Sequence, residues 1–266
     1  MNKIMRFENK VCWITGASSG IGKAVTLLLS QQSPKLILSA RNQEKLEEVK
    51  KDIDPKVEVS ILPLDLADNK EVLHQKAEEA YAIHQKIDCI FHIGGISQRA
   101  GFEETSYATF EQIFKVNFWG QLYLTKASLP YLREVSNPII VSINSVQGKF
   151  GVPERTAYSS SKHALLGFFD SLRAENVIPN LQITNILPGY VKTDLAKNAL
   201  LGDGSTQGHL DEGKEGITVE KAAQDIIKAV TNGKSEVVIG RPREKMAVLI
   251  KRFLPKVFEG LVSNKK

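Results

Sequence analysis

Short apolar runs alternate with longer segments of helical periodicity along most of the chain, and this alternation constrains the fold most strongly. The apolar runs lie at residues 10–15, 35–40, 57–62, 87–93, 138–143, 182–187 and 236–239, and the helical segments at 20–31, 43–51, 69–85, 107–132, 157–176 and 219–231. Runs that are apolar without polar alternation are typical of parallel strands covered by helices on both faces. The sequence therefore predicts an α/β fold with a doubly wound, Rossmann-type parallel sheet of about seven strands.

A single domain is expected, because no internal repeat, low-complexity stretch or linker-like segment occurs before residue 195. It would span residues 1–240 as a dinucleotide-binding unit. Within it, residues 195–216 are rich in glycine, poor in apolar side chains and follow a predicted strand. Long loops at such positions often cover substrates, so this segment is interpreted as a substrate lid, with plain disorder as the alternative.

Residues 241–266 differ from the rest of the chain in charge. They hold eight Lys/Arg and two Glu, whereas the whole chain has a formal net charge of +5, so the body is close to neutral. Apolar and basic side chains recur there at helical spacing around Pro255, namely Ile250, Leu254, Val257, Phe258 and Leu261 with Lys251, Arg252 and Lys256. Such a basic amphipathic tail suits peripheral contact with an intracellular membrane, and packing on the domain or on a partner subunit is the alternative.

Several classes of protein are not expected. The apolar runs are far shorter than the roughly 20 residues that cross a bilayer, and residues 1–10 lack the apolar core of a secretion signal, so a cytoplasmic location is predicted. Cys12 and Cys89 lie in apolar runs and should be buried, reduced thiols. The histidines lack metal-ligand spacing, and the body has no basic stripe with interleaved aromatic residues, so we expect no metal and no nucleic acid partner.

The first predicted strand ends in a glycine-rich turn that leads into a predicted helix. Glycines there permit a tight turn and close approach of the backbone to a pyrophosphate, which rests on the positive helix N-terminus. The candidate cofactor-binding residues of this turn are Gly16, Ser18, Ser19, Gly20, Ile21 and Gly22. The same stretch also fits Gly-x-Ser-x-Gly, which in a serine hydrolase would make Ser18 the nucleophile, with a later histidine such as His163 or His209 as its partner.

The end of the second predicted strand indicates which dinucleotide would bind. An acidic residue about 20 residues past the glycines would bind a ribose 2′-hydroxyl, whereas an arginine would meet a 2′-phosphate. Here that position carries Arg41 and no carboxylate. A guanidinium can bind the phosphate through charge-assisted hydrogen bonds, so the sequence predicts NADP(H) rather than NAD(H).

Tyr158 and Lys162 are four residues apart in a predicted helix, which places a phenol and an ammonium group on one face. A phenol with a pKa of about 10 exchanges protons poorly near neutral pH, and a nearby cation favours its ionised form. Ser145 follows the strand predicted at 138–143, and Asn117 lies within the preceding helical segment. These four residues are the candidate catalytic set.

These motifs together make the chain resemble a classical short-chain dehydrogenase/reductase over roughly residues 7–240. The motifs are the turn at 15–22, Asp65-Leu66, Asn117, Ser145, Tyr158 with Lys162, and the stretch 188–193. Segments 97–101, 145–149 and 172–175 further resemble the group around dehydrogenase/reductase family member seven. The resemblance implies an NADP-dependent oxidoreductase that interconverts a carbonyl and an alcohol, and a substrate that is lipid-like or steroid-like.

The resemblance also implies a role for each residue. Tyr158 would be the general acid/base, Ser145 would bind the substrate oxygen, and Lys162 would bind the nicotinamide ribose and lower the tyrosine pKa. Asn117 would hold a water molecule or a main-chain turn that relays protons. In the cofactor site, Asp65 would line the adenine pocket, the main chain at Gly95 the nicotinamide ribose, and Thr193 the carboxamide side.

One stretch departs from the family pattern, which commonly has Asn-Asn-Ala-Gly after the fourth strand. This chain has His92-Ile93-Gly94-Gly95, so the asparagine hydrogen bonds that support the sheet are expected to be missing, with His92 a structural residue. The family commonly assembles through the helices predicted at 107–132 and 157–176, so a homo-oligomer is expected. A non-catalytic NADP-binding module is the competing interpretation of the whole chain, although such a module has no need of Tyr158.

Overall fold

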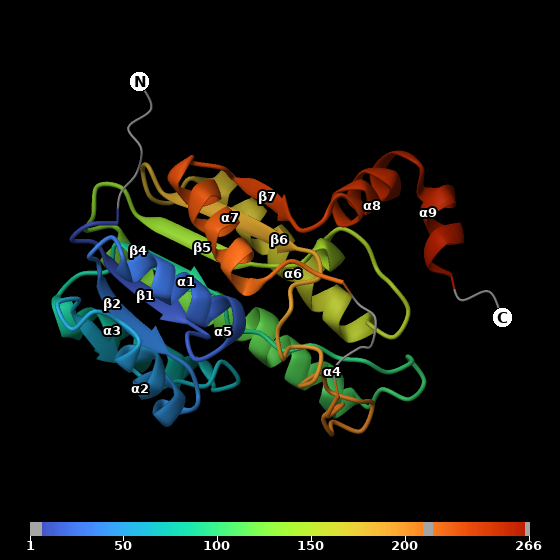
Figure 1. Ribbon diagram of the computed structural model, residues 1–266, viewed down its shortest axis with the longest axis horizontal. Coiled ribbons are helices and arrows are strands. Elements are labelled where there is room, and N and C mark those ends of the chain that lie inside the picture. The colour runs from blue at the N-terminus through green and yellow to red at the C-terminus, as the bar shows by residue number, and fades with distance from the viewer. Residues whose placement is uncertain (1–6, 210–214, 264–266) are drawn as a thin grey trace.

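A computed structural model describes residues 7–209 and 215–263 of the chain. Its centre is a sheet of seven parallel strands in the order β3-β2-β1-β4-β5-β6-β7 (Figure 1). The strands are β1 (Val11–Thr15), β2 (Lys35–Ser39), β3 (Val59–Ile61), β4 (Cys89–His92), β5 (Ile139–Ile143), β6 (Gln182–Pro188) and β7 (Glu236–Ile239). The chain order reverses direction between β1 and β4, which is the position where open α/β sheets bind ligands.

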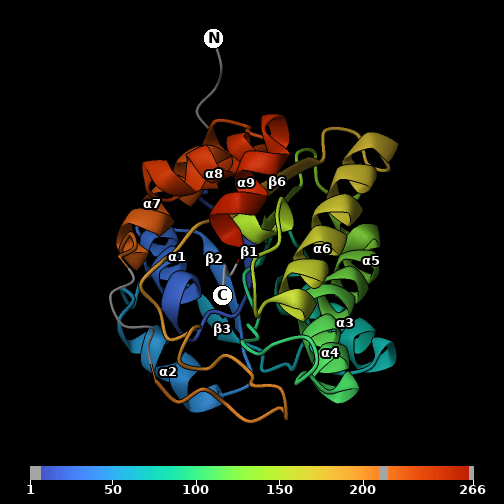
Figure 2. The same ribbon diagram turned by 90° about the vertical axis from the view of Figure 1, so that its right-hand side faces the viewer.

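Helices cover both faces of the sheet, as the apolar runs predicted (Figure 2). One face carries α1 (Gly20–Ser30), α2 (Gln43–Lys51) and α7 (Val219–Thr231), and the other carries α3 (Lys70–His84), α4 (Tyr107–Phe114), α5 (Gly120–Leu132) and α6 (Thr156–Glu175). Each face has its own apolar core. Cys12 and Cys89 are neighbours on β1 and β4, and both are buried and free, as predicted for their apolar runs.

The segment predicted as one helix over 107–132 is interrupted by a π-helical turn, η1 (Lys115–Trp119). The Gly120 N–H donates to the Lys115 carbonyl five residues earlier, which is the π pattern. Gly120 is required there, because a Cβ atom would lie 2.3 Å from the Leu66 carbonyl oxygen. The prediction of an uninterrupted α-helix was wrong, and the wider turn is where Asn117 enters the buried interior.

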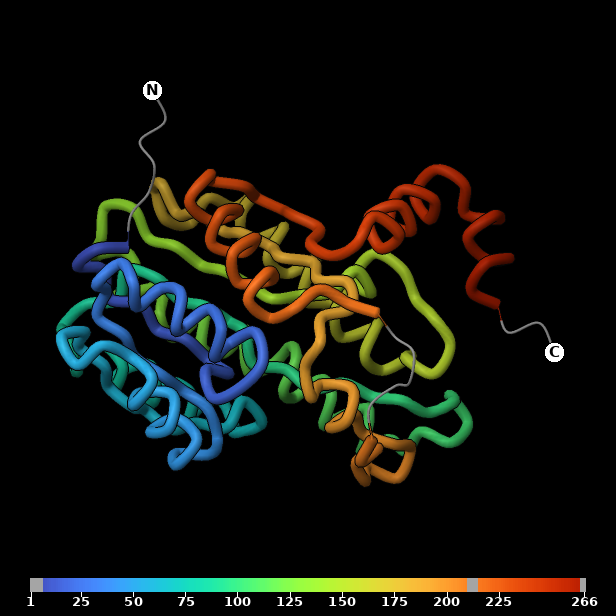
Figure 3. The backbone as a smooth tube through the Cα atoms, in the orientation of Figure 1, coloured from blue at the N-terminus to red at the C-terminus, as the bar shows by residue number. Residues whose placement is uncertain are grey.

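The segment after β6 crosses the carboxyl end of the sheet and meets the segment after β4 (Figure 3). Leu200 pairs with Gln98 and with Thr206 in isolated bridges, and the Ser106 N–H donates to the Gly202 carbonyl at 2.9 Å. The described part of the predicted lid is therefore held by main-chain contacts within itself and to the segment after β4. Residues 210–214 of the predicted lid lie outside the described residues.

The C-terminal tail forms two helices, α8 (Pro242–Phe253) and α9 (Pro255–Val262). The helical spacing around Pro255 is interrupted by a complete break at Leu254, whose backbone is not helical (φ −133°, ψ 59°). Figure 1 shows the pair projecting from the end of the sheet where β7 ends. Within the described residues, no helix is long and apolar enough to span a bilayer.

Candidate active site

The β1–α1 turn is built by glycines that bring backbone against backbone. Gly16 has φ +69°, and a Cβ atom on it would lie 2.6 Å from the Gly94 nitrogen in the segment after β4. On Gly22, a Cβ atom would lie 1.9 Å from the Gly16 carbonyl oxygen. The start of α1 therefore lies directly on the turn after β1, and Gly16 of that turn approaches the segment after β4 more closely than a side chain would allow.

The N-terminus of α1 is arranged to receive an anion. Its N-cap residue, Ser19, makes no side-chain capping bond, and its first turn contains no acidic residue. Thr193 lies across this turn, with its Cγ2 atom 3.2 Å from the place where a Cβ of Gly20 would be. Free N–H groups and the positive end of the helix dipole favour a phosphate group here, so the residues present fit a dinucleotide pyrophosphate.

Arg41 and Asp65 follow β2 and β3 at the same edge of the sheet. The Ala17 N–H of the turn donates to the Ser39 carbonyl at 3.1 Å, which holds the end of β2 beside the turn. Arg41 is exposed, and no ion pair of the described residues includes it. Asp65 is half-buried and accepts a 2.9 Å hydrogen bond from the Ala67 N–H. The guanidinium next to the phosphate-binding turn is therefore available to a further phosphate.

Tyr158, Ser145 and Lys162 come together at the carboxyl end of β5. Each side chain is almost fully buried, and the Tyr158 hydroxyl is hydrogen-bonded to Ser145. Ser145 is the N-cap of the short 3₁₀ helix η2 (Val146–Gly148) and accepts a 3.1 Å hydrogen bond from the Gln147 N–H. Lys162 Nζ donates to the Ile143 carbonyl at 3.0 Å and lies 5.9 Å from the centroid of the Tyr158 ring.

Asn117 joins this cluster to the segment after β4. Its Oδ1 accepts the Ile96 N–H at 2.9 Å, and its Nδ2 donates to the Ile96 carbonyl at 2.9 Å and to Ser161 Oγ at 3.1 Å. Of the two roles expected for Asn117, the described contacts match the one that holds a main-chain turn. A Cβ atom on the neighbouring Gly95 would lie 3.1 Å from Asn117 Oδ1 and 3.7 Å from Lys162 Nζ. A side chain at this position would therefore press against the cluster.

Burial changes the pKa values of the two titratable groups in the cluster. It raises the pKa of the Tyr158 phenol, and the hydrogen bond from Ser145 and the positive charge of Arg155 lower that pKa in part. Burial also lowers the pKa of Lys162 to about 8. Lys162 is not among the groups that lower the tyrosine pKa here, and its ammonium donates to the Ile143 carbonyl.

Arg155 is a residue that the sequence interpretation missed. It precedes α6 as its N-cap, three positions before Tyr158, and that spacing was the only available signal. Its guanidinium donates to the Gln98 carbonyl and is itself largely buried, which lowers its pKa. The positive charge of Arg155 thus lies beside Tyr158, on the side of the segment that contains Gln98.

His92 is a buried structural residue at the end of β4, as expected. Its Nε2 is 2.9 Å from Thr125 Oγ1 in α5, and burial lowers its pKa to about 3. The hydrogen bonds that an asparagine would make are replaced by other groups. Thr15 Oγ1 accepts the Ile93 N–H at 3.2 Å, and Gln121 Nε2 donates to the Gly94 carbonyl at 3.3 Å.

The hydrolase interpretation of Ser18 finds no support in this arrangement. His163 Nδ1 is bonded to the Ser159 carbonyl at 2.8 Å and His209 Nδ1 to the Gln207 carbonyl at 3.0 Å. Among the hydrogen bonds of the described residues, none joins Ser18 to either histidine. Ser18 therefore lacks the base that a serine nucleophile needs.

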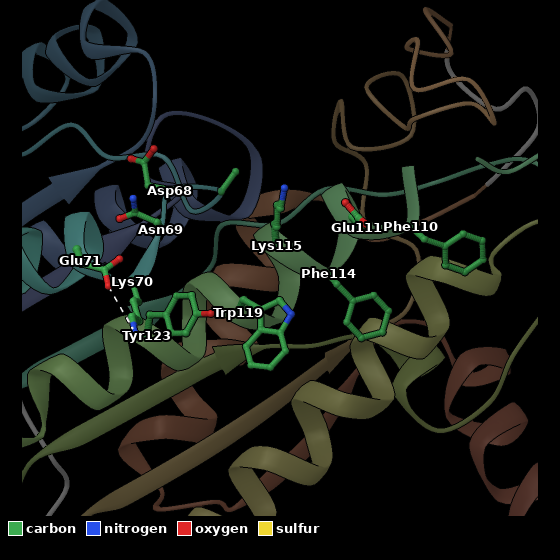
Figure 4. Close-up of a pocket in the computed structure, with 11 residues that line it drawn as sticks. Asp68, Asn69, Lys70, Glu71, Phe110, Glu111, Phe114, Lys115, Trp119 and Tyr123 are labelled. Carbon is green, nitrogen blue, oxygen red and sulfur yellow. Dashed lines mark ion pairs between the residues drawn. The ribbon is translucent and has the colours of Figure 1, made fainter. Parts of the chain in front are cut away.

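A pocket of about 810 Å³ lies away from this cluster, between the start of α3 and the α4–η1–α5 helices (Figure 4). Aromatic side chains from the latter helices line one side of it, namely Phe110, Phe114, Trp119 and Tyr123. Asp68, Lys70 and Glu71 line the opposite side. None of the candidate catalytic or cofactor-binding residues lines this pocket, so it is a separate surface feature.

Comparisons with known proteins agree with the fold. The family model described as short chain dehydrogenase matches residues 10–203. A protein of Anopheles gambiae named dehydrogenase/reductase SDR family protein 7-like is 39% identical over 258 residues, covering 94% of this chain and 81% of that protein. The Mus musculus protein named dehydrogenase/reductase SDR family member 7B is 34% identical over 264 residues, covering 97% and 81%.

Solved structures share the fold at lower sequence identity. A short-chain dehydrogenase from Burkholderia cenocepacia in complex with NADP superimposes with a TM-score of 0.81 at 21% identity, covering 97% of this chain and 99% of that chain. One from Burkholderia phymatum in complex with NAD gives 0.83 at 19% identity, covering 95% and 96%. The same fold thus carries either dinucleotide.

Proposed function

The chain belongs to the short-chain dehydrogenase family, and from that premise we propose that it is an NADP(H)-dependent oxidoreductase that interconverts a carbonyl group and a primary or secondary alcohol. The observation that carries this proposal is the buried cluster of Tyr158, Ser145, Lys162 and Asn117 beside Gly95. The nicotinamide supplies or accepts the hydride when the cofactor is bound. The protein's own groups must bind and orient the substrate oxygen and move one proton.

Tyr158 is the general acid in the reduction and the general base in the oxidation, with its proton at the phenol oxygen. Ser145 shares a hydrogen bond with that oxygen, so a substrate oxygen placed between them would receive both donors. The buried Lys162 ammonium lies beside Gly95 and would hold the ribose hydroxyls of the cofactor. Asn117 holds the Ile96 main chain in place, and so positions the segment after β4 that borders the site.

The cofactor would lie along the carboxyl edge of the sheet. Its pyrophosphate would meet the α1 N-terminus within the turn at 16–22, with Thr193 opposite. Arg41 supports NADP(H), because it is exposed at the end of β2 with no carboxylate of that strand end to repel a phosphate. Asp65, which lies next along this edge, would line the adenine pocket.

The first experiment measures NADPH oxidation by the wild-type protein and by Tyr158→Phe, across ketones graded from small and polar to lipid-like. The variant should lose about a thousandfold in turnover while it still binds NADPH, because only the proton donor is removed. Loss of NADPH binding by a folded variant would contradict the assigned role. A wild-type protein that binds NADPH and turns over no ketone would favour the non-catalytic binding module.

Cofactor choice is tested by Arg41→Glu. The variant should bind NADPH about a hundredfold more weakly and NADH almost unchanged, because a charge-assisted contact is replaced by repulsion. Lys45→Glu, an equally exposed charge reversal one turn into α2, is the matched control and should change NADPH binding little. Equal losses for NADPH and NADH would contradict the role of Arg41 in binding a 2′-phosphate.

A homo-oligomer is the assembly that we propose for the enzyme. The exposed aromatic surface of α4, η1 and α5 supports it, since Tyr107 is 90% exposed and Trp119 is 43% exposed. Sedimentation velocity of the purified protein tests it, and a monomer at micromolar concentration would contradict it. The cytoplasmic location stays a prediction.

A further inference from the structure

The C-terminal helices α8 and α9 have an inner apolar face that fastens them to the domain. The ring centroids of Phe258 in α9 and Phe150 are 4.9 Å apart, and Val146, Leu166 and Leu187 complete this cluster. Phe258 is the only side chain of the two helices that is fully buried among the described residues. The two helices are therefore held in a defined place against the segment that follows Ser145.

Their outer face is also apolar and is open to solvent. Along α8 the exposed apolar residues are Met246, Leu249 and Phe253, which are 55%, 51% and 70% exposed. Along the next turns they are Leu254, Val257 and Leu261, which are 55%, 52% and 67% exposed. Met246, Leu249 and Phe253 have the spacing i, i+3, i+7 and form one stripe on α8. Val257 and Leu261 are four residues apart and form a second stripe on α9, with Leu254 at the break between the helices. The described residues contain no comparable concentration of exposed apolar side chains within one short segment.

Basic side chains flank these two stripes. Residues 241–263 contain six Lys/Arg and two Glu. Lys245, Arg252 and Lys256 are exposed, and the Arg252 guanidinium lies 5.6 Å from the centroid of the Phe253 ring. An apolar stripe bordered by long basic side chains can insert into the boundary between headgroups and acyl chains while the cations contact phosphate groups.

We propose that the outer face of α8 and α9 docks the protein on an anionic phospholipid bilayer. The charge of the face favours this occupant, because the exposed Lys245, Arg252 and Lys256 attract the negative surface potential of such a membrane. A second copy of the chain is a poor occupant, since a two-fold contact would set the same net positive surface against itself. Figure 1 shows the two helices beyond the end of the sheet, at one end of the molecule.

The place of this face gives it a consequence for the substrate. The inner side of α9 packs on Val146 and Phe150, in the segment that begins at the substrate-binding candidate Ser145. A bilayer on the outer side of the two helices would therefore lie next to the route by which a substrate reaches Tyr158. This step rests on the proposed function, and it names the substrate class as an apolar ketone or alcohol that partitions into membranes.

The docking is tested by co-sedimentation of the full chain with vesicles of phosphatidylcholine alone and of phosphatidylcholine with 30% phosphatidylserine. The wild-type protein should bind the anionic vesicles and bind the neutral ones much more weakly. The double variant Phe253→Gln with Leu261→Gln, one change in each stripe, should reduce the partition coefficient at least about tenfold. The double variant Arg252→Gln with Lys256→Gln should reduce it about thirtyfold.

The matched control is Val72→Gln with Ile83→Gln, which removes two exposed apolar side chains from α3 and should leave vesicle binding unchanged. Thermal melting and NADPH binding of every variant show that the fold is kept. Wild-type protein that ignores anionic vesicles overturns the proposal, and so does equal binding by the stripe variant. Loss of dimers in the stripe variant without any vesicle binding would make a second copy the occupant. A water-soluble ketone assay without vesicles reports separately on the proposed function.

Discussion

At the β1–α1 turn the groups that face a ligand are main-chain N–H groups, and the side chains there are absent or small. Around Tyr158 the arrangement is reversed, because the reactive groups are side chains and the main chain holds them. Lys162 is bonded to the Ile143 carbonyl, and Asn117 to both polar groups of the Ile96 backbone. The two regions meet along the short segment at 94–96, which Gly16 contacts on one side and Asn117 on the other.

Because of this difference, different kinds of substitution should disrupt the two regions. The turn depends on close backbone contacts that leave no room for side-chain atoms. Any added Cβ atom should therefore disrupt it, and few changes of backbone position should be tolerated. The cluster depends on buried hydrogen bonds, so it should be damaged when one partner is removed and the other is left unpaired. Substitutions that add one carbon at the turn, or remove one polar group at the cluster, separate these two cases.

The largest effect is expected at the turn, from Gly22→Ala. The added Cβ would lie 1.9 Å from the Gly16 carbonyl oxygen, and both atoms belong to a tightly packed backbone. The free energy of unfolding should fall by at least about 3 kcal/mol, and NADPH should bind at least tenfold more weakly. Urea unfolding and fluorescence titration measure the two quantities.

Gly167→Ala is the control for this substitution, because a Cβ on Gly167 in α6 meets nothing within 4 Å. It should raise the free energy of unfolding by about 0.5–1 kcal/mol, as alanine does in a helix. If Gly22→Ala were as stable as Gly167→Ala, the turn would not depend on close backbone contact.

In the cluster, Lys162 should make stability depend on pH. Its pKa falls from 10.5 in the unfolded chain to about 8 in the folded one, so the unfolded chain holds more protons between these values. The free energy of unfolding should therefore be highest above pH 10.5. It should fall by about 3 kcal/mol as the pH falls from there to about 8. Lys162→Met should remove this dependence.

The measurement is urea unfolding of wild-type protein and of Lys162→Met at pH 8 and pH 10.5. The difference in stability between the two proteins should shift by about 3 kcal/mol in favour of wild type at the higher pH. Lys115→Met, at an exposed position in η1, should follow the wild-type curve. Parallel curves for wild type and Lys162→Met would show that the ammonium is not desolvated.

The smallest of these effects is expected for Asn117→Ala. It removes three hydrogen bonds and leaves the Ile96 N–H and carbonyl without their partners, which should lower the free energy of unfolding by about 2 kcal/mol. Amide hydrogen exchange at Ile96 should accelerate at the same time. The exposed Asn137→Ala, which loses one bond to Ser136, should change stability by less than about 0.5 kcal/mol. Unchanged exchange at Ile96 would mean that another group holds this segment.

The sequence could predict the elements and most of the site residues, because these follow from local patterns. Apolar runs predicted the strands, and glycines 16, 20 and 22 predicted a turn in which two of the three have positive φ. The spacing of Tyr158 and Lys162 placed both on the inner face of α6, where both are buried. A local pattern could not predict the π turn that carries Asn117, since it depends on the close contact between Gly120 and Leu66.

By itself, the amino-acid sequence determined the parallel α/β class, the glycine turn and the residue types of the catalytic cluster, because helical and strand periods and short spacings are properties of neighbouring residues. Only the tertiary structure decided which distant groups meet. It brought Arg155 beside Tyr158, gave His92 a partner in Thr125, and left one stripe of α8 and one of α9 uncovered. Those outcomes depend on how crossover connections pack segments that lie far apart in the chain, and burial there sets both the pKa values and the exposed surface.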